Sequence, residues 1–426
     1  MRKFLPLLLF VVINFLGSCA VKYDTLSSLI SVDDNVSFDI TSGDPFFKEN
    51  YLVWFEQPID HNNPEGGTFK QRVWLSHKNE SAPVVMVTEG YSAPAAYKSE
   101  LAELLDANQI VVEHRFFGES VPEDGVPWEY LTIEQAANDH HRVIEYFNKL
   151  YKQRWITTGI SKGGQTAIIH RALYPKDVDV TVTYVAPYNL EREDKRLMSF
   201  FDSVGTEDQR RMIREFQIEI LQRENEIMPY MEELVREKQL SFSMPLDKVI
   251  ELAVLEYPFS LWQWCSSVPD KPASSFSAQE LFDYLYKGID FSYFSEQEAA
   301  VTGPFFYQAY TQLGYYSYNT SYLKNYLDYF HTDIVSNEFM VPKVDVEVVF
   351  DDSAINEITR RLHKADVEMI HIIGANDPWS STTLDISDLK NSITVKDPNG
   401  CHLTRINNLP DYLKHKVLDT LKNWLD

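Results

Sequence analysis

Hydrophobic runs and segments of helical period alternate along two parts of the chain. The runs 83–88 and 109–113 are apolar almost throughout, which is typical of strands buried on both faces of a parallel sheet. Helical patterns over 95–106 and 132–152 separate these runs from each other and from the next strand. The alternation predicts an α/β fold, in which helices cover both faces of a mainly parallel sheet.

Two runs of alternating hydrophobic and polar residues, 51–57 and 69–75, come before this pattern. The segment between them, 60–67, is dense in turn-forming residues. We expect the two runs to pair antiparallel and to open the sheet. The residues before them, 19–45, are rich in Ser and Asp and are assigned to a polar leader.

The pattern changes in the middle of the chain. Segments within 192–240 are charged and helical in period, and those within 247–340 are helical and rich in aromatic residues. No buried-strand pattern appears in either stretch. We therefore predict a helical cap, 188–340, inserted into a catalytic domain that consists of 46–187 and 341–426.

The N-terminus has the form of a signal peptide. The basic start Met1-Arg2-Lys3 precedes an apolar run at 4–16 that is too short to span a bilayer comfortably. The run ends in Leu16-Gly17-Ser18-Cys19, which resembles a bacterial lipobox. On that resemblance residues 1–18 are removed, the Cys19 sulfur carries lipid, and the protein is a periplasmic or cell-surface lipoprotein. The alternative is an ordinary secretory signal, with Cys19 incidental.

The charge balance limits the kinds of partner. Lys and Arg number 39 against 63 Asp and Glu, so the formal net charge is −24. A surface this acidic repels nucleic acid and anionic lipid headgroups, so we expect no nucleic-acid partner and membrane contact only through the lipid anchor. The sequence contains no C-x-x-C, H-E-x-x-H or G-x-x-x-x-G-K-[ST] motif, so no metal and no cofactor are expected.

Two cysteines, Cys265 and Cys401, remain if Cys19 is lipidated. In an exported chain they could form one disulfide that ties the cap to a C-terminal loop. Two buried free thiols are an equal alternative.

The segment Gly159-Ile160-Ser161-Lys162-Gly163 carries the strongest chemical signal. It follows a β-rich run at 154–158 and leads into a helix at 164–173, so Ser161 stands at a strand-to-helix turn. This is the G-x-S-x-G nucleophile elbow of α/β-hydrolases. The strained turn leaves no room for side chains beside the serine, and the helix directs N–H groups and the positive end of its dipole at the reacting oxygen.

A serine hydroxyl needs a base to take its proton and an acid to orient that base. Asp377 follows the strand predicted at 367–373, and His402 lies in the loop between the last strand and the final helix. The order Ser, Asp, His is that of α/β-hydrolases, so Ser161, Asp377 and His402 are the catalytic candidates. The alternatives are an aspartate that caps a turn and a histidine of a surface loop.

The oxyanion formed during acyl transfer needs two N–H donors. We expect one from the backbone of Lys162, the residue after the nucleophile. We expect the other from the backbone of Tyr91, in the loop after the strand at 83–88.

Several motifs together resemble one family. Glu89-Gly90-Tyr91, the stretch 113–120 (EHRFFGES), Ser-Lys-Gly-Gly at 161–164, Asp377-Pro378-Trp379 and the late His402 resemble the S37 serine peptidases, the bacterial prolyl tri- and tetrapeptidyl aminopeptidases. The S28 prolyl peptidases share the wider pattern, and the lysine after the nucleophile favours S37. The resemblance implies peptide substrates that contain proline, cut on the carboxyl side of proline to release short peptides from a free N-terminus.

The stretch 113–120 ends a buried strand. We expect Arg115 and Glu119 to make paired, buried polar contacts that brace the site, with no direct part in catalysis. His114 is an alternative catalytic base, but it precedes the serine in the chain, so His402 is preferred.

Proline specificity needs a small apolar pocket with aromatic walls. Trp379, beside the candidate acid, is the first choice, and Phe259, Trp262 and Trp264 are candidates from the cap, where an ordinary core role is the alternative. An aminopeptidase also needs a carboxylate for the substrate's ammonium group. The cap offers many, among which the sequence does not decide, including Glu224, Glu226, Glu232 and Glu233.

Three other functions fit the same residues. An S28-like dipeptidyl peptidase or prolyl carboxypeptidase would use the same triad, and an esterase would use the same fold. A non-catalytic surface-binding lipoprotein is the third, although candidate Ser, Asp and His residues in the expected order argue against it.

Overall fold

The computed structural model describes Leu26 and residues 35–426. The predicted signal peptide, 1–18, and Cys19 lie outside the described residues.

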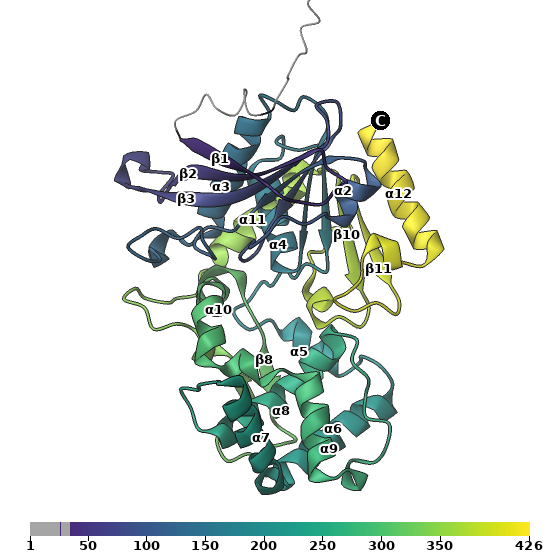
Figure 1. Ribbon diagram of the computed structural model, residues 1–426. Helices are drawn as coiled ribbons and strands as arrows, with labels where there is room; N and C mark the ends of the chain where they lie inside the picture. Colours follow the sequence, from purple (N-terminus) through teal and green to yellow (C-terminus); the bar gives the residue numbers. More distant parts are fainter. Residues whose placement is uncertain (1–25, 27–34) are drawn as a thin grey trace, which may run out of the picture.

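A nine-stranded sheet runs through the upper part of the molecule in the order β1-β2-β3-β5-β4-β6-β7-β10-β11 (Figure 1). The six strands from β5 to β11 pair in parallel, whereas β1, β2 and β3 are antiparallel. The strands are β1 (Val36–Thr41), β2 (Glu49–Pro58), β3 (Thr68–His77), β4 (Val84–Thr88), β5 (Asn108–Val112), β6 (Trp155–Ile160), β7 (Val180–Tyr184), β10 (Met369–Gly374) and β11 (Ser392–Asp397). The mainly parallel sheet and its antiparallel opening pair are both confirmed.

Helices cover the sheet on both faces, which completes an α/β-hydrolase fold. The side chains of α3 (Ile133–Phe147), α4 (Lys162–Leu173) and α11 (Asp352–Ala365) pack on one face, and those of α2 (Glu100–Leu104) and α12 (Asp411–Leu425) pack on the other. The central strands β4, β6 and β7 are buried on both faces because a helix lies against each. Helix α2 is shorter than the helix predicted over 95–106. It begins after Ser99, whose hydroxyl accepts a hydrogen bond from the Ala102 N–H and so caps the helix.

The assigned polar leader is partly wrong. Within 19–45, the residues Val36–Thr41 form β1, which pairs antiparallel with β2 at the edge of the sheet. Val36 is buried, whereas Ile40 is 80% exposed, so backbone hydrogen bonding rather than burial of a hydrophobic face holds this strand. The sequence does carry a strand signal here, since Val36, Phe38 and Ile40 alternate with polar residues, but it stands within a stretch rich in Ser and Asp.

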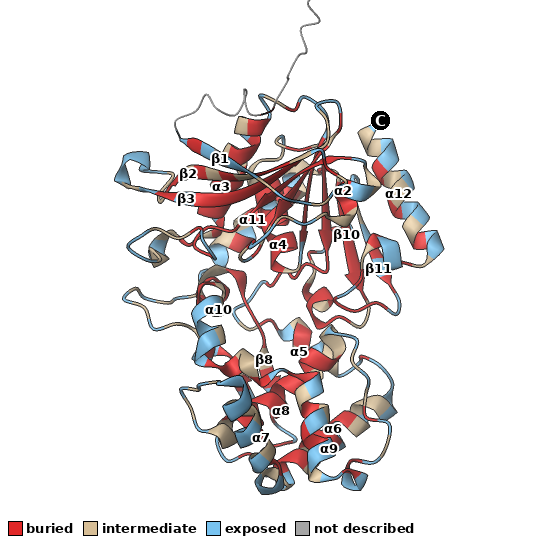
Figure 2. Ribbon diagram, in the orientation of Figure 1, coloured by how far each residue is buried: buried red, intermediate tan, exposed pale blue. Residues whose placement is uncertain are grey.

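The chain between β7 and α11 forms a helical body below the sheet (Figure 1). Its helices are α5 (Lys195–Phe201), α6 (Glu207–Gln222), α7 (Glu224–Lys238), α8 (Leu246–Gln263), α9 (Ala278–Gly288) and α10 (Glu296–Gln308). Helix α8 is buried along most of its length, with α6, α7 and α9 packed around it (Figure 2). Two short strands that the pattern did not indicate, β8 (Ser317–Asn319) and β9 (Ile334–Ser336), pair within this body. The boundaries of the cap at 188 and 340 stay a prediction.

Candidate active site

Ser161 lies at the turn between β6 and α4, with a strained backbone. Its φ of 55° and ψ of −127° fall in a region that residues with a side chain rarely adopt. A Cβ atom on Gly159 would collide with the backbone of Gly163, so the two ends of the turn approach as closely as only glycine allows. The first helical hydrogen bond runs from the Gln165 N–H to the Ser161 carbonyl, which leaves the N–H groups of the three residues before Gln165 without helical acceptors.

Asp377 and His402 form a buried hydrogen-bonded pair. Asp377 follows β10 directly and is fully buried, and its Oδ2 lies 3.0 Å from the His402 Nδ1. The Ser380 hydroxyl donates to the same oxygen at 2.9 Å, and the Trp379 N–H donates to Oδ1 at 3.2 Å. These bonds fix the carboxylate, and a carboxylate on Nδ1 makes Nε2 the nitrogen that can accept a proton.

The alternative base, His114, has different surroundings. Its Nδ1 contacts the Arg115 carbonyl at 2.9 Å, and its ring packs on Phe117. Burial lowers the pKa of His114 well below its ordinary value. The geometry therefore favours His402 as the base, because the carboxylate of Asp377 lies on that residue.

The end of α8 holds the histidine loop in three ways. The His402 N–H donates to the Gln263 carbonyl at 3.0 Å, and the Trp264 ring meets the imidazole edge-on at 5.7 Å between centroids. Cys265 and Cys401 form a disulfide with Cα atoms 5.7 Å apart, which decides between the two alternatives left open by the sequence. The helical body is thus linked covalently to the residue before His402.

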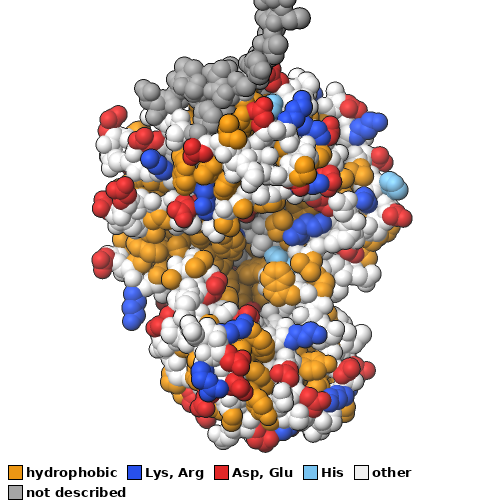
Figure 3. Space-filling view, viewed as in Figure 1, with side chains coloured by type: hydrophobic (Ala, Val, Ile, Leu, Met, Phe, Trp, Pro, Cys, Tyr) orange, Lys and Arg blue, Asp and Glu red, His pale blue; other side chains and the backbone are white. Residues whose placement is uncertain are grey.

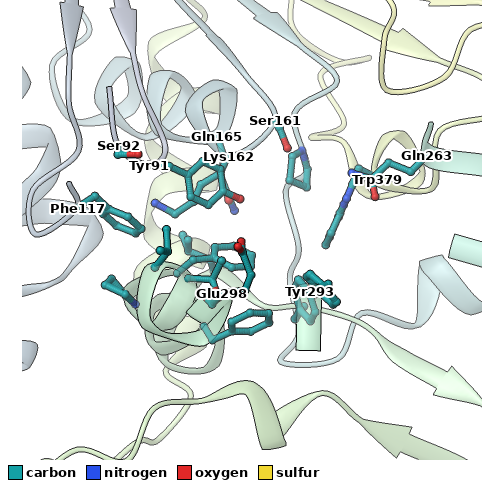
Figure 4. A pocket seen from close by; sticks show the side chains of 18 of the residues that line it. Tyr91, Ser92, Phe117, Ser161, Lys162, Gln165, Gln263, Tyr293, Glu298 and Trp379 are labelled. Carbon is teal, nitrogen blue, oxygen red and sulfur yellow. Dashed lines mark hydrogen bonds between the residues drawn. The ribbon is translucent and has the colours of Figure 1, made fainter. Parts of the chain in front are cut away.

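Tyr91 and Lys162 lie beside Ser161 on the wall of a single cavity (Figure 4). Gly90 packs so closely on the start of α4 that an added Cβ would lie 2.7 Å from the Lys162 Cβ. The Lys162 side chain is buried, donates to the Gly90 carbonyl at 2.5 Å and lies over the rings of Tyr91 and Phe117. Burial holds the pKa of Lys162 well below its ordinary value. Lys162 therefore ties the loop after β4 to the helix that begins at the elbow.

The cavity has a volume of about 780 Å³ and opens between the sheet layer and the helical body, where hydrophobic side chains surround a hollow (Figure 3). Of the predicted pocket residues, Trp379, Phe259 and Trp264 line it together with Ser161. Trp262 does not, and instead lines a second cavity of about 160 Å³ behind Phe259. Trp262 faces α5 and α6, whose residues line that second cavity together with it.

The acidic residues in the cavity wall are not the ones considered from the sequence. Glu256, Asp290 and Glu298 line the cavity. The four acids named from the sequence lie on α7 and do not line the cavity: Glu224, Glu226, Glu232 and Glu233. The signal that could have identified Glu256 is its position as a carboxylate inside the apolar run of α8, since a charge is seldom buried without a partner or a function.

The predicted pairing of Arg115 with Glu119 is wrong. Arg115 is fully buried and forms a two-pronged contact with Asp139, at 2.7 Å and 2.8 Å, and also donates to three backbone carbonyls. Glu119 is exposed. Asp139 lies on α3, far away in the sequence, so no local spacing could have indicated this partner.

A different carboxylate, Glu113, organises this loop. Its Oε1 accepts from the backbone N–H groups of Glu119 and Ser120, and its Oε2 accepts from the Ala93 N–H and from Arg72. One buried side chain thus holds both the loop after β5 and the loop after β4 that carries Tyr91. In the sequence, Glu113 stands out only as the last residue of a predicted strand.

A match to one family model extends over residues 26–424, and its description is PS-10 peptidase S37. The chain belongs to this family. It is therefore a serine peptidase, and its substrates are peptides.

Curated relatives agree with this assignment. The chain is 36% identical to a prolyl tri/tetrapeptidyl aminopeptidase of Streptomyces mobaraensis over 79% of this chain and 71% of the relative. A lysosomal Pro-X carboxypeptidase of Mus musculus is 31% identical over 34% of each chain. Among solved structures, a proline iminopeptidase of Mycobacterium smegmatis is similar at 14% identity and a TM-score of 0.47, over 87% of this chain and 98% of that one, a likeness too weak to bear on function.

The described part of the chain offers neither a candidate membrane-spanning helix nor a cluster of metal-ligating side chains. None of its helices is both long and apolar enough to cross a membrane. Within the same residues, no group of three or more His, Cys, Asp or Glu side chains is arranged to hold a metal ion.

The elbow predicts a large difference between two glycine substitutions. Gly159→Ala forces a Cβ into the backbone of Gly163, and overpacking of this kind costs about 1–3 kcal/mol of the free energy of unfolding. Gly303→Ala is the matched control, because the nearest atoms to its Cβ lie at 3.6 Å and 3.7 Å in Pro342. Thermal unfolding should show a lower Tm for Gly159→Ala than for the wild type and no decrease for Gly303→Ala. Equal Tm values of the two variants would contradict the close approach.

The disulfide predicts a redox-dependent stability. Its loss in a Cys265→Ser, Cys401→Ser double variant should lower the free energy of unfolding by about 2–5 kcal/mol, because the cross-link no longer restrains the unfolded chain. The variant should also react more slowly with an organophosphonate at Ser161, since His402 loses one of its supports. Dithiothreitol should reproduce both effects in the wild type and have no effect on the variant. If dithiothreitol changed neither the stability nor the organophosphonate reaction of the wild type, the cross-link would be refuted.

Proposed function

We propose that the protein is an exported serine exopeptidase that cuts after proline and releases tripeptides or tetrapeptides from free N-termini. The observation that carries the proposal is the placement of Ser161 on an aromatic-walled cavity, with a buried Asp377–His402 pair on the neighbouring loops. The similarity to a prolyl tri/tetrapeptidyl aminopeptidase supports the same conclusion.

In the proposed first step, the Ser161 Oγ attacks the carbonyl carbon of the proline residue. The His402 Nε2 takes the hydroxyl proton, and Asp377 stabilises the imidazolium that forms. The backbone N–H groups of Tyr91 and Lys162 stabilise the oxyanion. The C–N bond then breaks, and the C-terminal fragment leaves as an amine that takes the proton from His402. The N-terminal fragment stays attached to Ser161 as an ester.

In the second step, water replaces the leaving amine. His402 takes a proton from the water, hydroxide adds to the ester carbon, and the Ser161 oxygen leaves with the proton that His402 returns. The cycle restores the serine and needs no metal or cofactor.

Trp379 is the residue proposed to contact the proline ring. It is two residues from Asp377 and packs against Phe259 and Tyr316, with ring centroids 5.0 Å and 5.4 Å away. Aromatic faces suit the flat, apolar pyrrolidine ring. In this proposal the cap, 188–340, encloses the cavity and admits only short or unstructured peptides.

Export and lipid attachment at Cys19 are part of the proposal. The disulfide supports export, since such bonds persist in oxidising compartments, and the proposal of lipid attachment depends on the lipobox-like sequence alone.

The proposed activity predicts a defined product pattern. Peptides with an internal proline should be cut after that proline, and the products should be tri- or tetrapeptides from the N-terminus, as identified by mass spectrometry. N-acetylated versions of the same peptides should be poor substrates. Cleavage at sites unrelated to proline would refute the specificity, and faster cleavage of the acetylated peptides would favour an S28-like carboxypeptidase. If Ser161→Ala abolished ester cleavage while no prolyl peptide was ever cut, the protein would be an esterase.

The proposed triad predicts that Asp377→Asn lowers kcat by about 10³–10⁴-fold, because the amide cannot stabilise an imidazolium. The chain offers a matched control in Asp388→Asn, since the Asp388 carboxylate lies 2.9 Å from the Nδ1 of an exposed His363. That variant should keep wild-type kcat. Equal activity of the two variants would exclude Asp377 as the acid of the triad.

A further inference from the structure

Glu256 is a buried acidic residue in an apolar helix. It lies on α8 and is only 4% exposed, yet it forms part of the cavity wall that also carries Ser161. An ionised carboxylate in such a place is costly unless hydrogen bonds or a cation compensate it. The partners of Glu256 therefore indicate what the cavity is built to hold.

Two tyrosines satisfy one of the two carboxylate oxygens. The hydroxyls of Tyr316 and Tyr318 donate to the Glu256 Oε2 at 2.6 Å and 2.7 Å. Among the described residues, no side chain donates a hydrogen bond to Oε1 and no Lys or Arg forms an ion pair with Glu256. Among the described residues, Glu256 thus keeps one carboxylate oxygen without a protein donor.

The other two acids of the cavity wall are less suited to bind a cation. The Asp290 carboxylate already accepts from the Ser292 N–H and lies 3.5 Å from the Lys238 ammonium. Glu298 lies on α10 and is half-buried, where water screens its charge (Figure 4). Only Glu256 combines burial with an oxygen left open for a ligand.

A short chain of contacts connects Glu256 with the residues of the proposed triad. Trp379, two residues after Asp377, packs on Tyr316 with ring centroids 5.4 Å apart, and the Tyr316 hydroxyl reaches Glu256. An extended tripeptide spans roughly 10 Å, at about 3.3–3.6 Å per residue. A peptide with its proline on Trp379 could therefore extend its amino end toward Glu256.

We propose that Glu256 binds the α-ammonium group of the substrate and thereby determines how many residues lie between the N-terminus and the cut. This inference rests on the proposed aminopeptidase function. Tyr316 and Tyr318 hold Oε2, and Oε1 accepts a charge-assisted hydrogen bond from the ammonium group. An acetylated N-terminus lacks the charge and fills the space with an acyl group, so it is excluded.

The same site gives substrate binding a pH dependence. Burial raises the pKa of Glu256 to about 7, although the two tyrosine hydroxyls lower it. The titratable groups that face Glu256 are four tyrosines, Tyr293, Tyr315, Tyr316 and Tyr318. Burial raises the pKa of each, so these tyrosines stay neutral. Protonation of Glu256 removes the attraction for an ammonium group, so KM for free peptides should rise as the pH falls below about 7.

Steady-state kinetics on two reporters test the proposal. Gly-Gly-Pro-p-nitroanilide and its N-acetyl form are compared on the wild type, on Glu256→Gln and on the control Glu232→Gln, whose carboxylate is exposed on α7 and does not line the cavity. Glu256→Gln should lower kcat/KM about 10–100-fold for the free reporter, the loss expected for a buried charge-assisted hydrogen bond, and leave the acetylated reporter unchanged. Its KM should also lose the rise below about pH 7. Glu232→Gln should change neither reporter.

Folding is checked separately. Glutamine keeps an oxygen that can accept from the tyrosines, so the Tm of Glu256→Gln should not fall. An equal loss on both reporters, or the same loss in Glu232→Gln as in Glu256→Gln, would overturn the proposal.

Binding separates this inference from the proposed function. The tripeptide Gly-Gly-Pro and N-acetyl-Gly-Gly-Pro are titrated into Ser161→Ala by calorimetry, with and without Glu256→Gln. Tighter binding of the free peptide that disappears with Glu256→Gln supports the ammonium site even if the wild type cuts no prolyl bond. Equal binding of both peptides to Ser161→Ala refutes the ammonium site even if cleavage after proline is observed.

Discussion

The active site depends on the parallel pairing of the central strands. Parallel strands present their carboxyl ends at one edge of the sheet, and the proposed catalytic groups follow such ends: Tyr91 after β4, Ser161 after β6, Asp377 after β10 and His402 after β11. The strained backbone of Ser161 persists because β6 is paired on both sides and α4 packs beneath it. A shift in the pairing of these strands would separate all four residues.

The helical body does more than cover this edge. Its longest helix, α8, carries Phe259 and Glu256 into the cavity and ends at the three contacts that hold the His402 loop. Trp379, from the sheet layer, is part of the hydrophobic core of the helical body. One helix therefore connects the proposed substrate contacts with the loop that carries the proposed base.

The sequence was sufficient to predict the parallel sheet, the elbow and the family, because each leaves a local pattern. The β1 strand was missed although Val36, Phe38 and Ile40 alternate with polar residues, because the Ser- and Asp-rich residues around it favoured a leader. The Asp139 partner of Arg115 and the role of Glu113 were missed because both depend on contacts between distant elements. Glu256 did leave a signal, an acid within a largely apolar helix, but α8 also carries Glu251, and only the fold places Glu256 in the cavity with Ser161.

A crystal structure of Ser161→Ala with a bound Xaa-Xaa-Pro peptide would test the account most directly. We expect the proline ring on Trp379, the proline carbonyl oxygen facing the Tyr91 and Lys162 amides, and the amino group on Glu256. A peptide bound in the opposite direction, with its amino group away from α8, would contradict the account.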